Sequence, residues 1–149
     1  MIKIEKMKEE YIDDVYEIDK ASFPIPWSRD LFREEINNPL AKFIIAKDEE
    51  IVVGFAVCWF VMDECHIGNI AVLPEYRKKG IASSLFNELL KNSQEEHSTK
   101  YLLLEVRASN TPAINLYKKL GFKELVVRKH YYKNPDGSYE DAIMMDKDL

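Results

Sequence analysis

A strand, a short basic turn and an amphipathic helix follow one another without a break between His66 and Ser93. The apolar run from His66 to Leu73 ends at Pro74, and the basic turn Arg77 to Lys79 leads into Gly80. Beyond the glycine, apolar residues recur at helical spacing, at Ala82, Leu85, Phe86, Leu89 and Leu90. A strand that leads directly into a helix of this kind predicts a sheet with helices layered against it.

The rest of the chain alternates between the same two kinds of element. Turn residues such as Asn37-Asn38-Pro39 and Asn134-Pro135-Asp136-Gly137 separate them. The pattern predicts helices over 8–22, 28–37 and 111–120, strands over 42–46, 51–62 and 101–106, and a closing hairpin of 122–132 with 140–146. We therefore predict a mixed α/β (α+β) fold.

Length and composition limit the organisation to one domain. The chain has 149 residues, which is enough for one core and too few for two, so we predict a single domain over residues 1–149. The net charge of -5 argues against a general nucleic-acid surface and favours the approach of a basic peptide or protein.

Location and metal binding are predicted from what the pattern lacks. Neither a signal peptide nor a membrane-spanning run is apparent, and Cys58 and Cys65 are expected to be reduced thiols, so we predict a cytoplasmic protein that does not bind membranes. The histidines show no ligand spacing, and no metal is expected; they are His66, His97 and His130.

The start of the helix at Gly80 has the chemistry of an anion site. Backbone N–H groups at a helix start are unpaired, and a glycine lets a phosphate approach closely. Positive side chains there oppose the helix dipole, so the basic turn from Arg77 to Lys79 is best balanced by an anion. These features predict a pyrophosphate site, with a merely solvated basic surface as the alternative.

The same segment resembles a known family. Arg77-Lys78-Lys79-Gly80-Ile81-Ala82 matches the Arg/Gln-x-x-Gly-x-Gly/Ala signature of the GNAT acetyltransferases, in which alanine is a common alternative at the last position. The resemblance is closest to the bacterial ribosomal-protein alanine N-acetyltransferases and covers nearly the whole chain. It is carried by 23–28, 69–72, 104–110, 113–114, 116–117, 120–122, 131–132 and 140–144.

The resemblance implies a GNAT fold with acetyl-CoA as cosubstrate. It implies a central mixed, mostly antiparallel sheet, with helices on both faces. The parallel middle strands, His66 to Val72 and Tyr101 to Val106, would splay apart around the pantetheine arm. The implied cosubstrate contacts are Ile70, Ala71, Val72, Arg77, Lys78, Lys79, Gly80, Ile81, Ala82, Ser83, Asn110 and Tyr117.

The resemblance also implies the catalytic pair and the acceptor. Glu105 would be the general base and Tyr117 the general acid, while the acceptor channel would be walled by Pro26, Trp27, Tyr131 and Tyr132. The acceptor would be the N-terminal alanine of small-subunit ribosomal protein eighteen, a basic partner. We expect a monomer or weak dimer.

Elementary acid–base chemistry agrees with an α-amine acceptor. The pKa of an α-amine is about 7.7 to 8.0, against about 10.4 for lysine, so a weaker base can deprotonate an N-terminus. Burial of Glu105 or a relaying water would be needed for proton removal. Proton transfer from Tyr117 to a thiolate is uphill by about 2 kcal/mol for unperturbed groups. A backbone N–H near Val72 is expected to stabilise the developing oxyanion.

Each position also has a structural explanation. Glu105 could form a surface ion pair with Arg107, Tyr117 shares a helical stripe with core residues, and Asn110 could be only a helix cap. Trp27 and the Tyr131-Tyr132 pair could be core or rim residues. Acetylation of a lysine side chain or polyamine, and a non-catalytic acetyl-CoA sensor, remain the functional alternatives.

Overall fold

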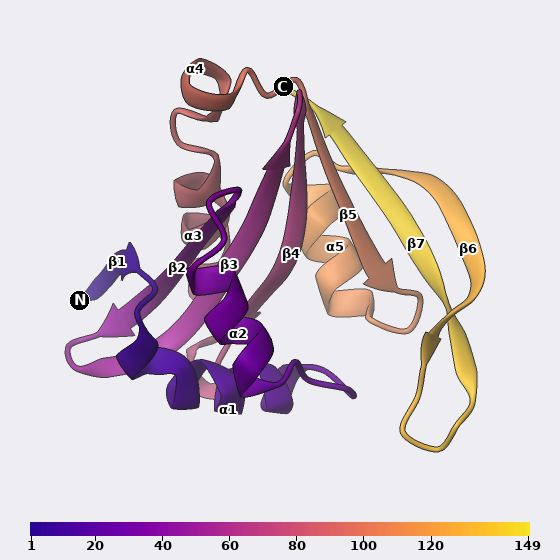
Figure 1. The fold of residues 1–149 in the computed structure, drawn as a ribbon. Coiled ribbons are helices and arrows are strands. Elements are labelled where there is room, and N and C mark those ends of the chain that lie inside the picture. The colour runs from indigo at the N-terminus through magenta and orange to yellow at the C-terminus, as the bar shows by residue number, and fades with distance from the viewer.

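The computed structural model describes residues 1–149 and contains one seven-stranded sheet, in the order β1-β2-β3-β4-β5-β7-β6 (Figure 1). Neighbouring strands are antiparallel except β4 and β5, which are parallel. The strands are β1 Ile2–Lys6, β2 Ala41–Asp48, β3 Ile51–Val61, β4 Glu64–Val72, β5 Tyr101–Arg107, β6 Lys123–Lys133 and β7 Tyr139–Asp148.

Helices cover both faces of the sheet, as predicted (Figure 1). On one face, α1 and α2 pack over an apolar cluster that includes Phe43 and Ile45 of β2; on the other, α3 and α5 share a second cluster with Ile44 and Ala46. Alternate residues of one strand thus enter opposite cores. The helices are α1 Ile12–Ser22, α2 Arg29–Ile36, α3 Ile81–Leu90, α4 Ser93–His97 and α5 Thr111–Lys119, with 3₁₀ turns at Glu9–Tyr11 and Pro74–Tyr76. None of them has the length and apolar character needed to cross a membrane.

The sheet divides between its two parallel strands. β4 and β5 are paired at only three positions, Glu64 with Tyr101, Cys65 with Leu102 and His66 with Leu103. Beyond these pairs β4 stays bonded to β3 as far as Val72, and β5 stays bonded to β7 as far as Arg107. Figure 1 shows the two strands meeting at one end and diverging toward the other. The predicted splay is confirmed.

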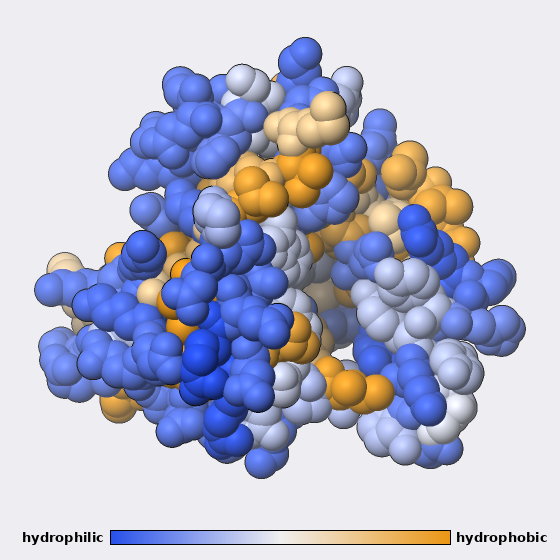
Figure 2. Space-filling view, viewed as in Figure 1, coloured by the Kyte–Doolittle hydropathy of each residue, from blue (hydrophilic) through white to orange (hydrophobic).

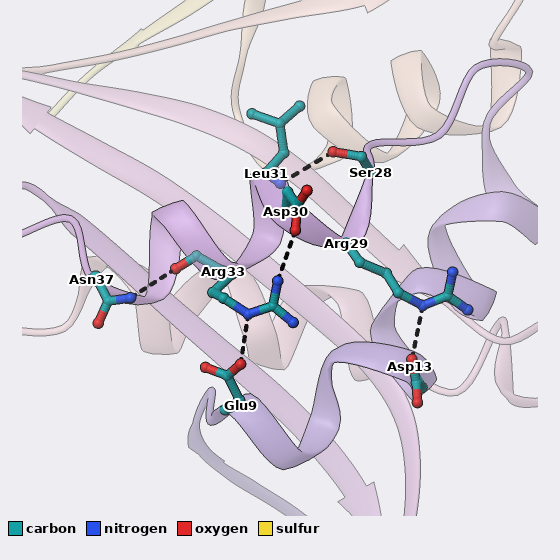
Figure 3. A network of polar contacts seen from close by, with 8 residues as sticks. All are labelled: Glu9, Asp13, Ser28, Arg29, Asp30, Leu31, Arg33 and Asn37. Atoms are coloured by element: carbon teal, nitrogen blue, oxygen red, sulfur yellow. Dashed lines mark hydrogen bonds and ion pairs between the residues drawn. The ribbon is translucent and has the colours of Figure 1, made fainter.

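Helix α2 is held against the sheet by one buried ring. Phe32 is fully buried and lies 5.7 Å from the ring of Phe55. Figure 3 shows the polar contacts of α2, in which Arg29 pairs with Asp13 of α1 and Arg33 pairs with Glu9. These pairs are solvent-exposed and contribute little, whereas burial of a phenylalanine contributes about 1.5–3 kcal/mol.

Two elements were not predicted from the sequence. β1 is an edge strand of five residues, and its alternation of charged residues with Ile2 and Ile4 was too short to distinguish it from a loop. The five-residue helix α4 begins after Asn92 and ends at Ser98, both in left-handed conformations. Such short elements depend on their neighbours, here on pairing with β2 and on stacking of His97 against Phe60.

A β-bulge distorts β4 just before its unpaired stretch. Ala56 pairs with Ile70 and Cys58 pairs with Ile67, so β4 carries one residue more than β3 across this interval. The bulge includes Gly68, where an added Cβ would lie 2.6 Å from the Trp59 ring. The glycine therefore permits close packing of the tryptophan over the bulge.

Gly68→Ala is expected to lower the free energy of unfolding by about 1–3 kcal/mol, because the new methyl group overlaps the Trp59 ring. Urea unfolding measures this cost. In a Trp59→Leu background the same substitution should cost less than about 1 kcal/mol, since the overlapping ring atoms are gone. Equal costs in both backgrounds would show that the ring does not impose the glycine.

Candidate functional site

A cleft of about 1090 Å³ occupies the space between the diverging strands. Its walls come from the ends of β4 and β5, the segment that begins α3, helix α5, the loop between α1 and α2, and β6. Figure 2 shows a hollow on this side of the molecule, between the lobe of α1 and α2 and the lobe of β6 and β7, with apolar residues along its rim. The volume slightly exceeds the range of about 300–1,000 Å³ usual for small-molecule sites.

The free edge of β4 presents backbone polar groups to this cleft. The N–H of Leu73 donates to the Val53 carbonyl at 2.8 Å. Because successive strand residues turn their polar groups to opposite edges, Val72 and Ile70 turn theirs away from β3 and toward the gap. In agreement, Arg77 Nε donates to the Val72 carbonyl at 3.0 Å. The Val72 N–H thus faces the cleft, as expected for an oxyanion donor.

The start of α3 offers a series of unpaired donors. The backbone N–H groups of residues 78–83 donate to no backbone carbonyl and to no side chain, and Gly80 provides no capping side chain. Lys78 and Gly80 both have positive φ, which curls the segment, and the space where a Cβ of Gly80 would stand is open. Consecutive N–H groups in such a curve form an anion-binding concavity.

Most residues predicted to hold the cosubstrate line the cleft. They are Ile70, Ala71, Val72, Arg77, Lys78, Gly80, Ile81, Ala82, Ser83, Asn110 and Tyr117. Lys79 does not, because its ammonium group lies over the ring of Tyr76, 5.4 Å from the ring centre. Arg77 also has a structural role, since its guanidinium donates hydrogen bonds to the Val72 carbonyl and to the Ser22 hydroxyl of α1.

Asn110 combines the two alternatives considered for it. Its side-chain oxygen accepts a hydrogen bond from the Ala113 N–H at 3.3 Å and so caps α5. The residue also lines the cleft. Since capping occupies the oxygen, the amide NH₂ remains as the donor that a ligand could use.

Glu105 lies on the cleft wall without an ion-pair partner. The ion pair with Arg107 that the sequence allowed does not form, because Arg107 bonds instead to Glu140 at 2.9 Å and to Asn134 at 2.8 Å. Glu105 is solvent-exposed, while its strand neighbours Leu104 and Val106 are buried on the opposite face. Of the two routes expected for Glu105, burial among apolar neighbours is excluded, and water has access to its carboxylate.

Two tyrosines of β6 face this carboxylate. A hydrogen bond with Glu105 raises the pKa of Tyr131, and burial, reinforced by the negative charge of Glu105, raises the pKa of Tyr132. A bulge in β6 brings them here: His130 has a positive φ, and its N–H donates to Asp141 at 3.0 Å. Both phenols stay protonated near neutral pH and can donate hydrogen bonds.

Tyr117 is a core residue whose hydroxyl reaches the site. Its ring is buried 5.8 Å from the ring of Phe122, in an edge-on arrangement, and the residue lines the cleft. Its hydroxyl has no hydrogen-bond partner within the protein but is not sealed from the cleft. Burial raises the pKa of Tyr117 to about 12. The phenol therefore stays protonated near neutral pH and can donate a hydrogen bond.

The acceptor-side residues are only partly brought together. Trp27, Tyr131 and Tyr132 line the cleft, whereas Pro26 does not. The two β6 tyrosines also contact each other, with ring centres 5.1 Å apart. The loop residues Phe23 and Ile25 complete this wall.

Sequence reasoning assigned no role to two polar residues beside this wall. Asp19 of α1 is fully buried and Asn69 of β4 lines the cleft, and the two side chains are bonded at 2.9 Å. Burial raises the pKa of Asp19 to about 6. A signal was present, since Asp19 lies seven residues after Ile12 and so occupies the apolar stripe of its helix.

From the sequence alone, a single acidic residue in an apolar stripe could equally mean that the buried face of the helix had been assigned wrongly.

No group of three His, Cys, Asp or Glu side chains is placed to hold a metal ion.

Comparison with known proteins gives consistent matches over the whole fold. Residues 12–122 match the model of the acetyltransferase (GNAT) family. The [ribosomal protein bS18]-alanine N-acetyltransferase of Haemophilus ducreyi is 36% identical over 95% of this chain and 97% of its own. The crystal structure of the ribosomal-protein-S18-alanine N-acetyltransferase of Escherichia coli superposes with a TM-score of 0.88 at 32% identity, covering 100% of this chain and 94% of the other.

A more distant structure shares the fold alone. Arabidopsis thaliana NAA60 in complex with acetyl-CoA superposes with a TM-score of 0.91 at 22% identity, over 100% of this chain and 99% of that one.

The raised pKa of Tyr117 can be measured directly. Wild type and Tyr117→Phe should show the same ultraviolet tyrosinate absorbance up to about pH 11, because the missing phenol does not ionise below that pH. In denaturant the two should differ near pH 10, where an exposed phenol titrates. A difference near pH 10 in the folded proteins would contradict the burial of the group.

Proposed function

This chain belongs to the GNAT acetyltransferase family and is an acetyl-CoA-dependent N-acetyltransferase, and we propose that it acetylates the α-amine of a protein that begins with alanine. We propose ribosomal protein bS18 as its natural acceptor, which is the acceptor named for the relatives in Haemophilus ducreyi and Escherichia coli. The net charge of -5 suits a basic partner.

The observation that carries the proposal is the cleft between β4 and β5, because it has donors for phosphate at one end and acid–base groups beside its middle. The six unpaired N–H groups of residues 78–83 and the cation of Lys78 suit a pyrophosphate. Acetyl-CoA supplies a thioester whose acetyl carbon an amine can attack. The free polar edge at Ile70 and Val72 suits the amide groups of a pantetheine arm.

Glu105 would accept the proton that the amine loses. An α-amine is already partly neutral near pH 7, so an exposed carboxylate needs only to take up the remaining proton. Because Glu105 is open to solvent, we favour a water molecule between amine and carboxylate. The Tyr131 and Tyr132 hydroxyls lie beside the same carboxylate and can orient it.

Val72 and Tyr117 would stabilise charge on the acetyl side. The Val72 N–H points into the cleft, where it can donate to the oxygen that becomes negative. Full proton transfer from Tyr117, with its pKa of about 12, to a thiolate whose conjugate thiol has a pKa of about 8.5 is uphill by about 5 kcal/mol. Tyr117 therefore acts first by donating a hydrogen bond to the departing sulfur. After the bond to the acetyl carbon has broken, the thiolate takes a proton from Tyr117 or from solvent.

The substrate class is tested with paired peptides. One peptide begins with a free alanine and contains an internal lysine; the other is identical but has its N-terminus blocked. After incubation with acetyl-CoA, mass spectrometry should find a single acetyl group, on the alanine of the free peptide only. Acetylation of the blocked peptide alone would establish a lysine acetyltransferase, and no turnover with any amine would favour an acetyl-CoA sensor.

The roles of the two catalytic candidates are tested by substitution. Glu105→Gln and Tyr117→Phe should each lower kcat by about 100-fold or more, because each removes a group that acts on a proton in the reaction. The Kd for acetyl-CoA should change by less than about threefold in Glu105→Gln. Stopped assays and isothermal titration measure the two quantities.

Matched controls separate these effects from general damage. Glu64→Gln changes a carboxylate at the closed end of β4, and Tyr139→Phe changes an exposed tyrosine of β7; neither residue lines the cleft. Both should keep kcat within about twofold of wild type. Full activity of Glu105→Gln would remove Glu105 from the mechanism.

A further inference from the structure

Asp19 is a buried carboxylate that joins two walls of the cleft. It is fully buried in the last turns of α1. One of its oxygens accepts the Trp27 N–H at 2.8 Å, and the other accepts the Asn69 side-chain amide at 2.9 Å. Trp27 belongs to the loop between α1 and α2, and Asn69 belongs to the β4 bulge, so the carboxylate bridges two segments that are 42 positions apart in the chain.

No cation balances this charge. Asp19 forms no ion pair, and burial raises its pKa in spite of the two hydrogen bonds, which lower it. A charge in such a place opposes folding, and an apolar side chain would fill the space at less cost. The two hydrogen bonds that Asp19 accepts are therefore what an apolar side chain at this position could not provide.

The nearest ion pair to the loop is a surface contact. The ion pair of Arg29 with Asp13, seen in Figure 3, lies in solvent, with Asp13 85% exposed. Exposed pairs contribute little and are screened by salt. Buried hydrogen bonds to a charged group are stronger and hold their partners in one geometry. The Trp27 backbone is thus linked to β4 through Asp19, while its ring packs against Phe32 and Trp59.

We propose that Asp19 is a positioning residue for the acceptor peptide, which rests on the function proposed above. By holding the Trp27 backbone and the Asn69 amide together, it fixes the distance between the acceptor wall and the strand that presents the acetyl group. Small displacements of a reacting amine reduce its rate of attack steeply. The loop needs this anchor because, of the other loop residues that line the cleft, Phe23 is only partly buried and Ile25 is exposed.

The test separates acceptor binding from cosubstrate binding. Asp19→Ala removes both acceptors and should lower kcat/KM for the alanine-starting peptide about tenfold, mainly through a higher KM, with the Kd for acetyl-CoA within about twofold of wild type. Asp19→Asn should recover most of the loss, because its oxygen can accept from Trp27 and the Asn69 amide can rotate to match its NH₂ group. Asp13→Ala, a change of the same residue type in the same helix, should leave both constants unchanged.

A second measurement does not depend on activity. Hydrogen exchange of the Trp27 amide should be at least about tenfold faster in Asp19→Ala than in wild type, and unchanged in Asp13→Ala. An unchanged peptide KM, unchanged Trp27 exchange, or equal losses of peptide and acetyl-CoA binding in Asp19→Ala would overturn the positioning role. Wild type that acetylates no free α-amine would instead overturn the proposed function, and the positioning role with it.

Discussion

The separation of β4 from β5 after three residue pairs is the constraint on which the site depends. Two parallel strands that part inside a sheet leave backbone N–H and C=O groups without ladder partners, and such groups are unfavourable when kept from water. Here they face a water-accessible cleft, and one of them, the Val72 carbonyl, is bonded by Arg77. The unpaired edges make the middle of the sheet a place where a long polar ligand gains hydrogen bonds without displacing existing ones.

Each half of the sheet keeps its own support, which is why the opening can persist. Strands β1 to β4 are packed between α1 and α2 on one face and α3 on the other. Strands β5 to β7 are backed by α5 and tied by the Arg107–Glu140 pair, whose side chains are 12% and 18% exposed. Lys147 also bonds the Leu120 carbonyl at the end of α5, at 2.7 Å. The cleft is thus the joint between two well-packed parts, the usual location of a binding site.

Local patterns predicted the parts of the fold that are set by local chemistry. The strand, basic turn and helix around Gly80 followed from hydrophobic spacing and from the unpaired N–H groups of a helix start, and the splay followed from the family resemblance. The strand β1 and the bulges in β4 and β6 were not predicted, because register depends on partner strands distant in sequence.

In the candidate site, too, local sequence predicted which residues would take part, whereas their environment depends on segments distant in the chain. Glu105 and Tyr117 were predicted as a pair and both line the cleft, but the exposure of one and the burial of the other depend on how β5 and α5 pack. Lys79 and Pro26 were predicted to take part and do not line the cleft, since adjacency in a motif does not fix where a side chain points. Asp19 and Asn69 are 50 positions apart, and only the folded chain brings them together.

Backbone amide NMR of the isotope-labelled protein, titrated with coenzyme A, tests the central claim most directly. If the open strands and the α3 start form the binding site, the largest shifts will map to the amides of residues 78–83, to Ile70 and Val72, and to Asn110. Large shifts confined to α1, α2 or the outer edge of β6, with the amides of residues 78–83 unmoved, would contradict the account.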